Sequence, residues 1–586
     1  MGMGATDTEG RLLACFGQAS EIPPSFDSNI DVVNGGVLLA LPALLVNGLL
    51  SKVKEHFSLP NGFYSIFSYF ILLAFMALGR VKRIENLRQI PPGEWGKLIG
   101  YDRIPEVRTL RHKIALLTSN ENVKEWAGEL SAEWIKDYQE SLNHFYVDGH
   151  VRIYHGKQTE LPKHYLTRRK MCMRGTCDYW LNARDGQPFC YISKTVDPGM
   201  ISVLENEIVP ILEKLFPEEA NLEKPMEEKP DSQTKKTVWF TPHDFKGKPR
   251  FSLICDRESY GIKYMLNMAK KGIACMTYTK KPDENWDVDE FRSESMITSL
   301  GEKIEYKIAE RYVLKFIDKK PAIWIREIRR LKDDNKQGSI TVTDYKSEST
   351  YCYYSVTSRW SQENFFGYMM QHFGLDALTD YKMRDMDDTT KLINPNWRKI
   401  DSEIRKETSI LNRIKAKFNS ILLDDDIDTN EFKESQEIKA KLHTDITQLQ
   451  SVIEQKKQER KKIPKKIKFS ELPEEYKFQQ LNPHSKYFID TIKMISYRAE
   501  TAMVNTLIEK LSRWDFNEAR AIIRGIYQSS ADFEIDEEAK TFTVKLHHQA
   551  INKYDEAIRY LCEELTETQT LYPNTDLKLI YKLVSG

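Results

Sequence analysis

The sequence predicts an α/β protein with a core of one mixed five-stranded sheet with helices, a β-rich insertion, and helical domains at both ends. Two observations predict this fold class. The middle of the chain alternates between short β-branched or aromatic runs and amphipathic runs, the pattern of strands and helices that share one sheet. The two ends repeat apolar residues at spacings of three and four, which is typical of helices.

Composition narrows the class of protein. The 586 residues suffice for several domains with ample cores, and 41% of them are hydrophobic, as in globular proteins. Lys plus Arg and Asp plus Glu are both 86, so the net charge gives no overall attraction to nucleic acid. Basic residues gather in stretches that can either track a phosphate backbone or form solvated faces: Arg80–Lys113, Pro162–Arg174 and Lys456–Lys468.

Cysteine usage and the start of the chain bear on its location. The eight cysteines are scattered, and the first residues lack a basic region leading into an apolar one. We therefore expect a reducing compartment and no signal peptide, as for a cytoplasmic, nucleoid-associated protein. The sequence has no Gly-x4-Gly-Lys-Ser/Thr loop, so ATP is not implied.

The N-terminal part is predicted to be a flexible tail, residues 1–30, followed by a helical DNA-binding domain, residues 31–121. Its expected helices are Gly36–Lys52, Phe63–Lys82, Gly93–Gly100 and Val107–Leu117. The last two have the proportions of a helix-turn-helix. The second of them would present Arg108, Arg111 and Lys113 to DNA, although such helix pairs are also common packing units.

Two segments of this domain, Val32–Ser51 and His56–Gly79, contain no Asp, Glu, Lys or Arg. Each is near the ~20 residues of a membrane span. Pro42, Asn47 and a Pro-Asn-Gly turn interrupt them. Buried helices, with no membrane, are therefore expected.

The core is predicted in two parts, residues 122–279 and residues 357–398, around an insertion at 280–356. The first part has a helix, three strands, a helix, and then strand–helix–strand: Asn122–Ser141, His144–Tyr154, Met171–Asn182, Pro188–Lys194, Met200–Leu215, Phe251–Asp256, Glu258–Lys271 and Ile273–Tyr278. Glu218–Lys236 is predicted to be a linker. The insertion's expected strands are Tyr312–Ile317, Ile323–Arg330, Ser339–Tyr345 and Tyr351–Val356.

The C-terminal third changes character. Residues 399–468 carry apolar residues at coiled-coil spacing on both sides of the acidic run Asp424–Asp428, which predicts a helical hairpin that ends in a basic run. The hairpin can form a homodimer or stand alone, and the sequence leaves both open. Residues 469–586 are predicted to be an α+β domain.

Three acids are the candidate site. Asp148 lies in the middle of a predicted strand, Asp256 lies where a strand hands over to a helix, and Glu363 lies beside the apolar face of the helix that begins near Arg359. Each acid also has an ordinary structural interpretation. Asp148 can be a strand acid whose hydrogen bonds are satisfied locally, Asp256 a helix N-cap, and Glu363 a surface acid. Acids more than a hundred residues apart can converge only through a fold, and hard divalent cations prefer such carboxylate oxygens.

The residues around these acids resemble a known family. Arg359-Trp-x-x-Glu363-x-Phe-Phe followed by His372-x-Gly-Leu-Asp, together with Tyr146-Val-Asp148-Gly-His and Cys255-Asp256-Arg-Glu-Ser-Tyr, are similar to the motifs of DDE transposases of bacterial insertion sequences. The likeness extends from about Val33 to Glu363 and, more diffusely, to the C-terminus. Two positions depart from the family pattern, since Val356 and Met370 stand where members often carry a tyrosine and a lysine.

The resemblance implies an RNase H-like core, whose order of elements is the one predicted above. It also implies DNA cleavage and strand transfer with two Mg²⁺ or Mn²⁺ ions held by Asp148, Asp256 and Glu363, on double-stranded DNA of transposon ends and target. The insertion would then contact the transposon end. We expect Arg359 to clamp a phosphate, Arg257 to be a weaker phosphate contact, and Trp360 to be either a stacking platform or, preferentially, a core residue.

Other functions stay open at this stage. An RNase H-like nuclease or resolvase would cut without joining. A DNA-binding protein that has lost catalysis is suggested by Val356 and Met370. A membrane-associated protein would rest on the two uncharged segments.

Overall fold

The computed structural model describes residues 6–138, 143–156, 161–166, 169–217, 249–282, 284–298, 303–377, 383–421, 429–510, 515–549 and 551–584. The predicted linker Glu218–Lys236 and acidic run Asp424–Asp428 lie outside these residues. The chain divides into two compact units. Unit 1 comprises residues 1–154, 163–382 and 482–586, and unit 2 comprises residues 155–162 and 383–481.

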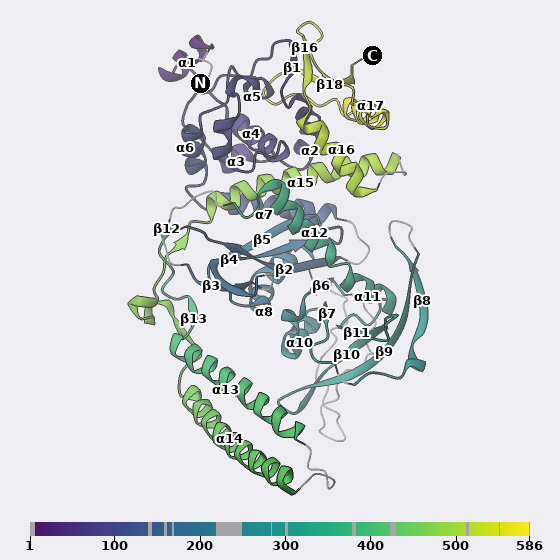
Figure 1. Cartoon of the computed structure of the whole chain (residues 1–586). Helices are drawn as coiled ribbons and strands as arrows, with labels where there is room; N and C mark the ends of the chain where they lie inside the picture. Colours follow the sequence, from purple (N-terminus) through teal and green to yellow (C-terminus); the bar gives the residue numbers. More distant parts are fainter. Residues whose placement is uncertain are drawn as a thin grey trace, which may run out of the picture. The chain divides into compact units, whose positions relative to one another are not determined.

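The described part of unit 1 contains a ten-stranded sheet (Figure 1). Its order is β3-β4-β2-β6-β7-β11-β10-β9-β8, and β5 pairs with a later part of β4. The strands are β2 (His144–Ile153), β3 (Lys163–Leu166), β4 (Met171–Asn182), β5 (Pro188–Lys194), β6 (Phe251–Cys255), β7 (Ile273–Tyr278), β8 (Arg292–Ile297), β9 (Lys303–Ile317), β10 (Lys320–Leu331) and β11 (Gln337–Val342).

The predicted succession of elements is present at the centre of this sheet. β2, β4 and β5 are antiparallel neighbours, and β2, β6 and β7 run parallel. A helical segment joins β5 to β6 and a helix joins β6 to β7, as parallel strands require. These are α8 (Met200–Val203) with the π-helical η3 (Leu204–Ile208) and α9 (Val209–Leu215), and then α10 (Ile262–Lys270).

The prediction of a β-rich insertion apart from a five-stranded core sheet is wrong in one respect. β11 pairs antiparallel with β7, and β10, β9 and β8 follow it, so the insertion's strands extend the central sheet beyond the five strands expected. The predicted strand Tyr351–Val356 is also wrong, because these residues lie in helix α11 (Ser349–Thr357). Cys352, Tyr353 and Val356 are buried there at helical spacing, so tertiary packing overrides their β propensity.

The N-terminal part contains α1 (Thr8–Cys15), α2 (Leu41–Val46), α3 (Val53–His56), α4 (Ile66–Leu78), α5 (Pro92–Ile99), α6 (Val107–Leu117) and α7 (Asn122–Asp137). The single helix expected over Gly36–Lys52 is wrong. A 3-10 turn η1 (Gly35–Ala40) precedes α2, and α2 stops before Asn47 and Gly48, where φ reaches +90°. The described part of the predicted tail is packed, because Arg11 pairs with Asp102 at 2.5 Å.

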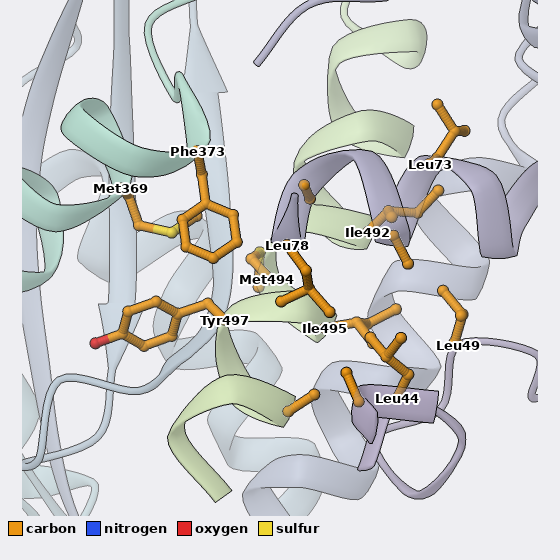
Figure 2. Close-up of a cluster of buried hydrophobic side chains, with 14 of the residues drawn as sticks. Leu44, Leu49, Leu73, Leu78, Met369, Phe373, Ile492, Met494, Ile495 and Tyr497 are labelled. Carbon is orange, nitrogen blue, oxygen red and sulfur yellow. The ribbon is translucent and has the colours of Figure 1, made fainter. Parts of the chain in front are cut away.

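The N- and C-terminal domains predicted separately share one body. β1 (Asn29–Val32) pairs with β16 (Ala531–Asp536), and the sheet continues through β17 (Thr541–Leu546) and β18 (Lys578–Leu583). Helix α15 (His484–Lys510) is buried along most of its length, followed by α16 (Phe516–Gln528) and α17 (Asn552–Glu567). Figure 2 shows Leu78 of α4, Ile495 of α15 and Phe373, near the candidate site, in one apolar cluster.

The helical parts of the uncharged N-terminal segments are largely buried, as expected, although Val46 is 88% exposed. Most residues of α4 are inaccessible to solvent within the core of unit 1. Across the described residues, no helix has the length and apolarity needed to cross a membrane.

Unit 2 contains the predicted helical hairpin. α13 (Pro395–Ser420) and α14 (Thr429–Lys461) pack through Ile404, Leu411 and Ile453. Two small antiparallel ribbons accompany them: β13 (Lys391–Ile393) with β14 (Lys466–Lys468), and β12 (Met383–Arg384) with β15 (Gln480–Leu481).

Candidate active site

The two aspartates occupy neighbouring positions on adjacent strands. β2 and β6 are parallel, and Val147 pairs with Cys255 in their register. Asp148 and Asp256 each come one residue later, so they lie at the same level of strands that are about 4.8 Å apart. The Asp256 side chain makes no capping hydrogen bond to the turn η5 (Arg257–Ser259) that follows it, which removes the helix-cap alternative.

The third acid is carried by α12 (Trp360–Tyr368), which continues as a π-helical turn, η7 (Met369–Phe373), and ends at Gly374 with φ +63°. Gln362, adjacent to Glu363, is fully buried. Its amide nitrogen donates to the Trp180 carbonyl at 3.2 Å and to Asn182 Oδ1 at 2.8 Å, both on β4. These bonds fix the first turn of α12 on the sheet, and with it the position of Glu363.

Arg359 lies between the acids. Its guanidinium donates to Asp148 Oδ2 at 2.9 Å and to Glu363 Oε1 at 3.2 Å. The Arg359 side chain is 13% exposed, whereas Asp148 is 23% exposed and Glu363 53% exposed. The arginine is therefore the enclosed member of the group, and Glu363 is the member open to solvent.

The pKa shifts of Arg359 and Asp148 both reflect the carboxylates around them. Burial alone would lower the pKa of Arg359, but Asp148, Asp256 and Glu363 outweigh it and raise that pKa. Burial raises the pKa of Asp148; Arg359 and the Gly149 backbone N–H oppose the rise, while Asp256 and Glu363 add to it. In this environment, any added positive charge stabilises the ionised form of the Asp148 carboxylate.

The oxygen donors suit Mg²⁺ or Mn²⁺, and the residues that would hold such ions are Asp148, Asp256 and Glu363. Within the described ranges, however, no three His, Cys, Asp or Glu side chains are close enough together to hold a metal ion. Arg359 supplies the positive charge between Asp148 and Glu363 in this structure. The donor chemistry thus fits a metal once Arg359 releases Asp148.

The preferred interpretation of Trp360 as a core residue is wrong. Its side chain is 62% exposed. Helical spacing explains this, because Trp360 lies one turn before Glu363 on the face that Glu363 occupies. An exposed indole beside the third acid is available to stack on a base.

The remaining basic candidates fall into two places. Arg257 directly follows Asp256, is exposed, and has its guanidinium 6.0 Å from the Tyr278 ring. Arg108 on α6 is also exposed. Arg111 pairs with Glu85 at 2.8 Å, and Lys113 donates to the Pro60 carbonyl at 3.5 Å. Two of the three predicted α6 contacts are thus engaged within the protein, and α6 packs on the N-terminal segment rather than beside the acids (Figure 1).

Sequence reasoning missed Gln362, although a signal was present. Positions 362, 366, 369 and 373 share one helical face, so a glutamine stood at the head of an otherwise apolar stripe. It also missed a hydrogen-bonded contact between the quoted motifs, in which His150 Nε2 lies 2.7 Å from Asp376 Oδ1. The two residues that depart from the family pattern pack in the interior. Val356 is buried, and Met370 is half-buried against the core.

Comparison with known proteins identifies the family. A family described as "Transposase protein" matches residues 2–585 of the chain. No curated protein matches it, and no solved structure does. The match spans nearly the whole chain, both units and all three acids included. The protein therefore belongs to this transposase family.

Proposed function

We propose that this transposase is of the DDE type, and that Asp148, Asp256 and Glu363 carry metal-dependent DNA cleavage and strand transfer. The observation that supports it most is the approach of these acids, from β2, the end of β6 and α12, to the single guanidinium of Arg359. The succession of β2, β4, β5, a helix, β6, α10 and β7 agrees with the RNase H-like core that the resemblance implies.

Bound at these carboxylates, two Mg²⁺ or Mn²⁺ ions would supply an activated water or 3′-hydroxyl and stabilise the leaving oxygen. The chain's own residues position the DNA. Arg359 exchanges its ion pair with Asp148 for a backbone phosphate, a bidentate partner of comparable charge. Trp360 stacks on a base at the cleaved end, and Arg257 contacts a neighbouring phosphate.

The proposal is tested by incubating wild type and Glu363→Gln with the element's own ends and Mn²⁺, and measuring nicked and joined products. Exposed Glu55 of α3 provides the matched control, Glu55→Gln. We expect nicking and joining by wild type and by the control, and neither by Glu363→Gln. Equal products from all three proteins would contradict the proposal.

The same assay separates the alternatives. Nicking without joining would indicate a nuclease or resolvase. DNA binding by wild type without any metal-dependent nicking would indicate a protein that has lost catalysis, the outcome favoured if Arg359 never releases Asp148.

A further inference from the structure

Unit 2 contains a small ribbon with an unusual charge arrangement. β13 and β14 come from opposite sides of the helical hairpin in sequence and pair antiparallel. Lys391 lies directly opposite Lys468, and Ile393 lies opposite Lys466. Like charges at directly opposed positions destabilise a sheet. The ribbon therefore carries a repulsion that its own fold does not need.

The hydrogen-bond pattern of the ribbon brings the side chains of Lys391 and Lys468 close together. The Phe469 N–H donates to the Thr390 carbonyl at 2.8 Å, and the Asn394 N–H donates to the Lys465 carbonyl at 3.0 Å. Hydrogen-bonded and non-hydrogen-bonded pairs alternate along an antiparallel ribbon. The pair Lys391–Lys468 is therefore a non-hydrogen-bonded pair, the type in which facing side chains are closest.

The three lysines share one face of the ribbon. Strand residues two apart point to the same side, so Lys466 joins Lys391 and Lys468, while Leu392 between them is buried on the other side. All three lysines are exposed, and none has a carboxylate within ion-pair distance among the residues that the structure describes. The carboxylate of Glu471 accepts from the Lys468 backbone N–H at 3.0 Å.

The same two segments of unit 2 carry further basic residues. The charged groups of Lys465 and Arg460 lie 5.2 Å and 5.3 Å from the Trp397 ring, and Arg460 also pairs with Asp401. Further exposed basic side chains come from the start of α13 and from the residues around the end of α14: Arg398, Lys399, Lys461 and Lys462. The positive charge is thus concentrated by folding from two segments about seventy residues apart.

We propose that the β13–β14 face, defined by Lys391, Lys466 and Lys468, binds the backbone phosphates of duplex DNA. This inference rests on the proposed function for its partner, because a transposase of this type acts on DNA. Lysine is a point-charge contact for phosphate and reads no sequence, so the face contributes affinity rather than specificity. A phosphate between Lys391 and Lys468 also relieves their repulsion.

The test measures duplex binding against salt concentration, in EDTA so that no metal chemistry contributes. The variant is Lys391→Gln/Lys466→Gln/Lys468→Gln. The control is Lys415→Gln/Lys417→Gln/Lys441→Gln, which removes three exposed lysines elsewhere on α13 and α14. Each lost phosphate contact lowers the slope of log K against log salt by about 0.9, so we expect the variant's slope to fall by roughly 2.7 and the control's to stay at the wild-type value.

Equal slopes for the variant and the control would overturn the inference and leave the lysines as protection of an exposed sheet edge. Folding is monitored separately, and the unfolding midpoint of the triple variant is expected to rise because the Lys391–Lys468 repulsion is gone. Lys466→Gln alone, opposite an isoleucine, should lower the slope by about 0.9 without that rise. If wild type binds duplex DNA with the expected slope but never cleaves it, the proposed function is refuted, while the β13–β14 face stands as a DNA-binding surface.

Discussion

Arg359 and Asp148, 211 residues apart in sequence, form an ion pair of 2.9 Å at the centre of the candidate site. The pair joins the third-acid helix to the first-acid strand. It also places a positive charge where the proposed chemistry needs one.

Arg359→Gln should lower the free energy of unfolding by about 2 kcal/mol at neutral pH, since it leaves Asp148 partly buried without its charged partner. Arg359 opposes the burial that raises the pKa of Asp148, so that pKa rises further in the variant. A carboxyl whose folded-state pKa is raised favours the folded state in acid and loses that contribution as pH rises through this pKa. Chemical denaturation should therefore show a deficit at neutral pH that shrinks in acid; a deficit independent of pH would contradict it.

Gln362→Leu should cost about 2 kcal/mol of unfolding free energy, because the buried Asn182 Oδ1 and Trp180 carbonyl each lose a donor. It should also reduce DNA cleavage more than the stability loss explains, since Glu363 is the next residue. Asn364→Ala, an exposed neighbour on α12, is the control and should leave both unchanged. Equal stability of the two variants would show that Gln362 does not hold the helix.

Trp360→Ala should change the free energy of unfolding by less than about 0.5 kcal/mol, as for other exposed positions, while reducing joined DNA product. Trp360→Phe should retain most of the joining, because a second aromatic ring can stack. A large loss of stability in Trp360→Ala would restore the core interpretation.

Glu500→Gln should cost about 3 kcal/mol. Glu500 is fully buried, pairs with Arg80 at 2.5 Å, and accepts a hydrogen bond from Tyr368 of α12. Removing its charge leaves the largely enclosed Arg80 without its carboxylate partner and loosens α12 from α15. Glu509→Gln, an exposed position on α15, should be neutral in thermal and chemical unfolding, and a matching loss there would contradict the argument.

The sequence predicted the centre of the fold well where local signals were strong. β4, β5, β7 and α6 have the predicted ends, because alternation or helical spacing stops there at turn residues. Tyr351–Val356 failed because its tyrosines and valine suit a strand and only packing makes it a helix. The pairing of β1 with β16 had no local signal, since it joins segments about five hundred residues apart.

For the candidate site, residue type, the predicted elements and the family resemblance together singled out the three acids, and the register of β2 against β6 places Asp148 and Asp256 side by side. Local pattern could not show that Arg359 would occupy the space between them, because that depends on the register of β2 against β6. The apolar stripe could have predicted the environments of both Gln362 and Trp360. The stripe contains position 362 and omits position 360, which is why one is buried and the other is not.

The most direct test of the central claim is Mn²⁺ binding by electron paramagnetic resonance, in the presence of duplex DNA of the element's ends that releases Arg359 from Asp148, to wild type, Asp256→Asn, Glu363→Gln and the control Glu55→Gln. Neither mutated acid is needed for the Arg359–Asp148 pair, so the fold of the site should persist. We predict Mn²⁺ binding by wild type and control, and weakened binding by both site variants. Equal Mn²⁺ affinity in all four proteins would contradict the assignment of Asp148, Asp256 and Glu363 as the metal-binding acids.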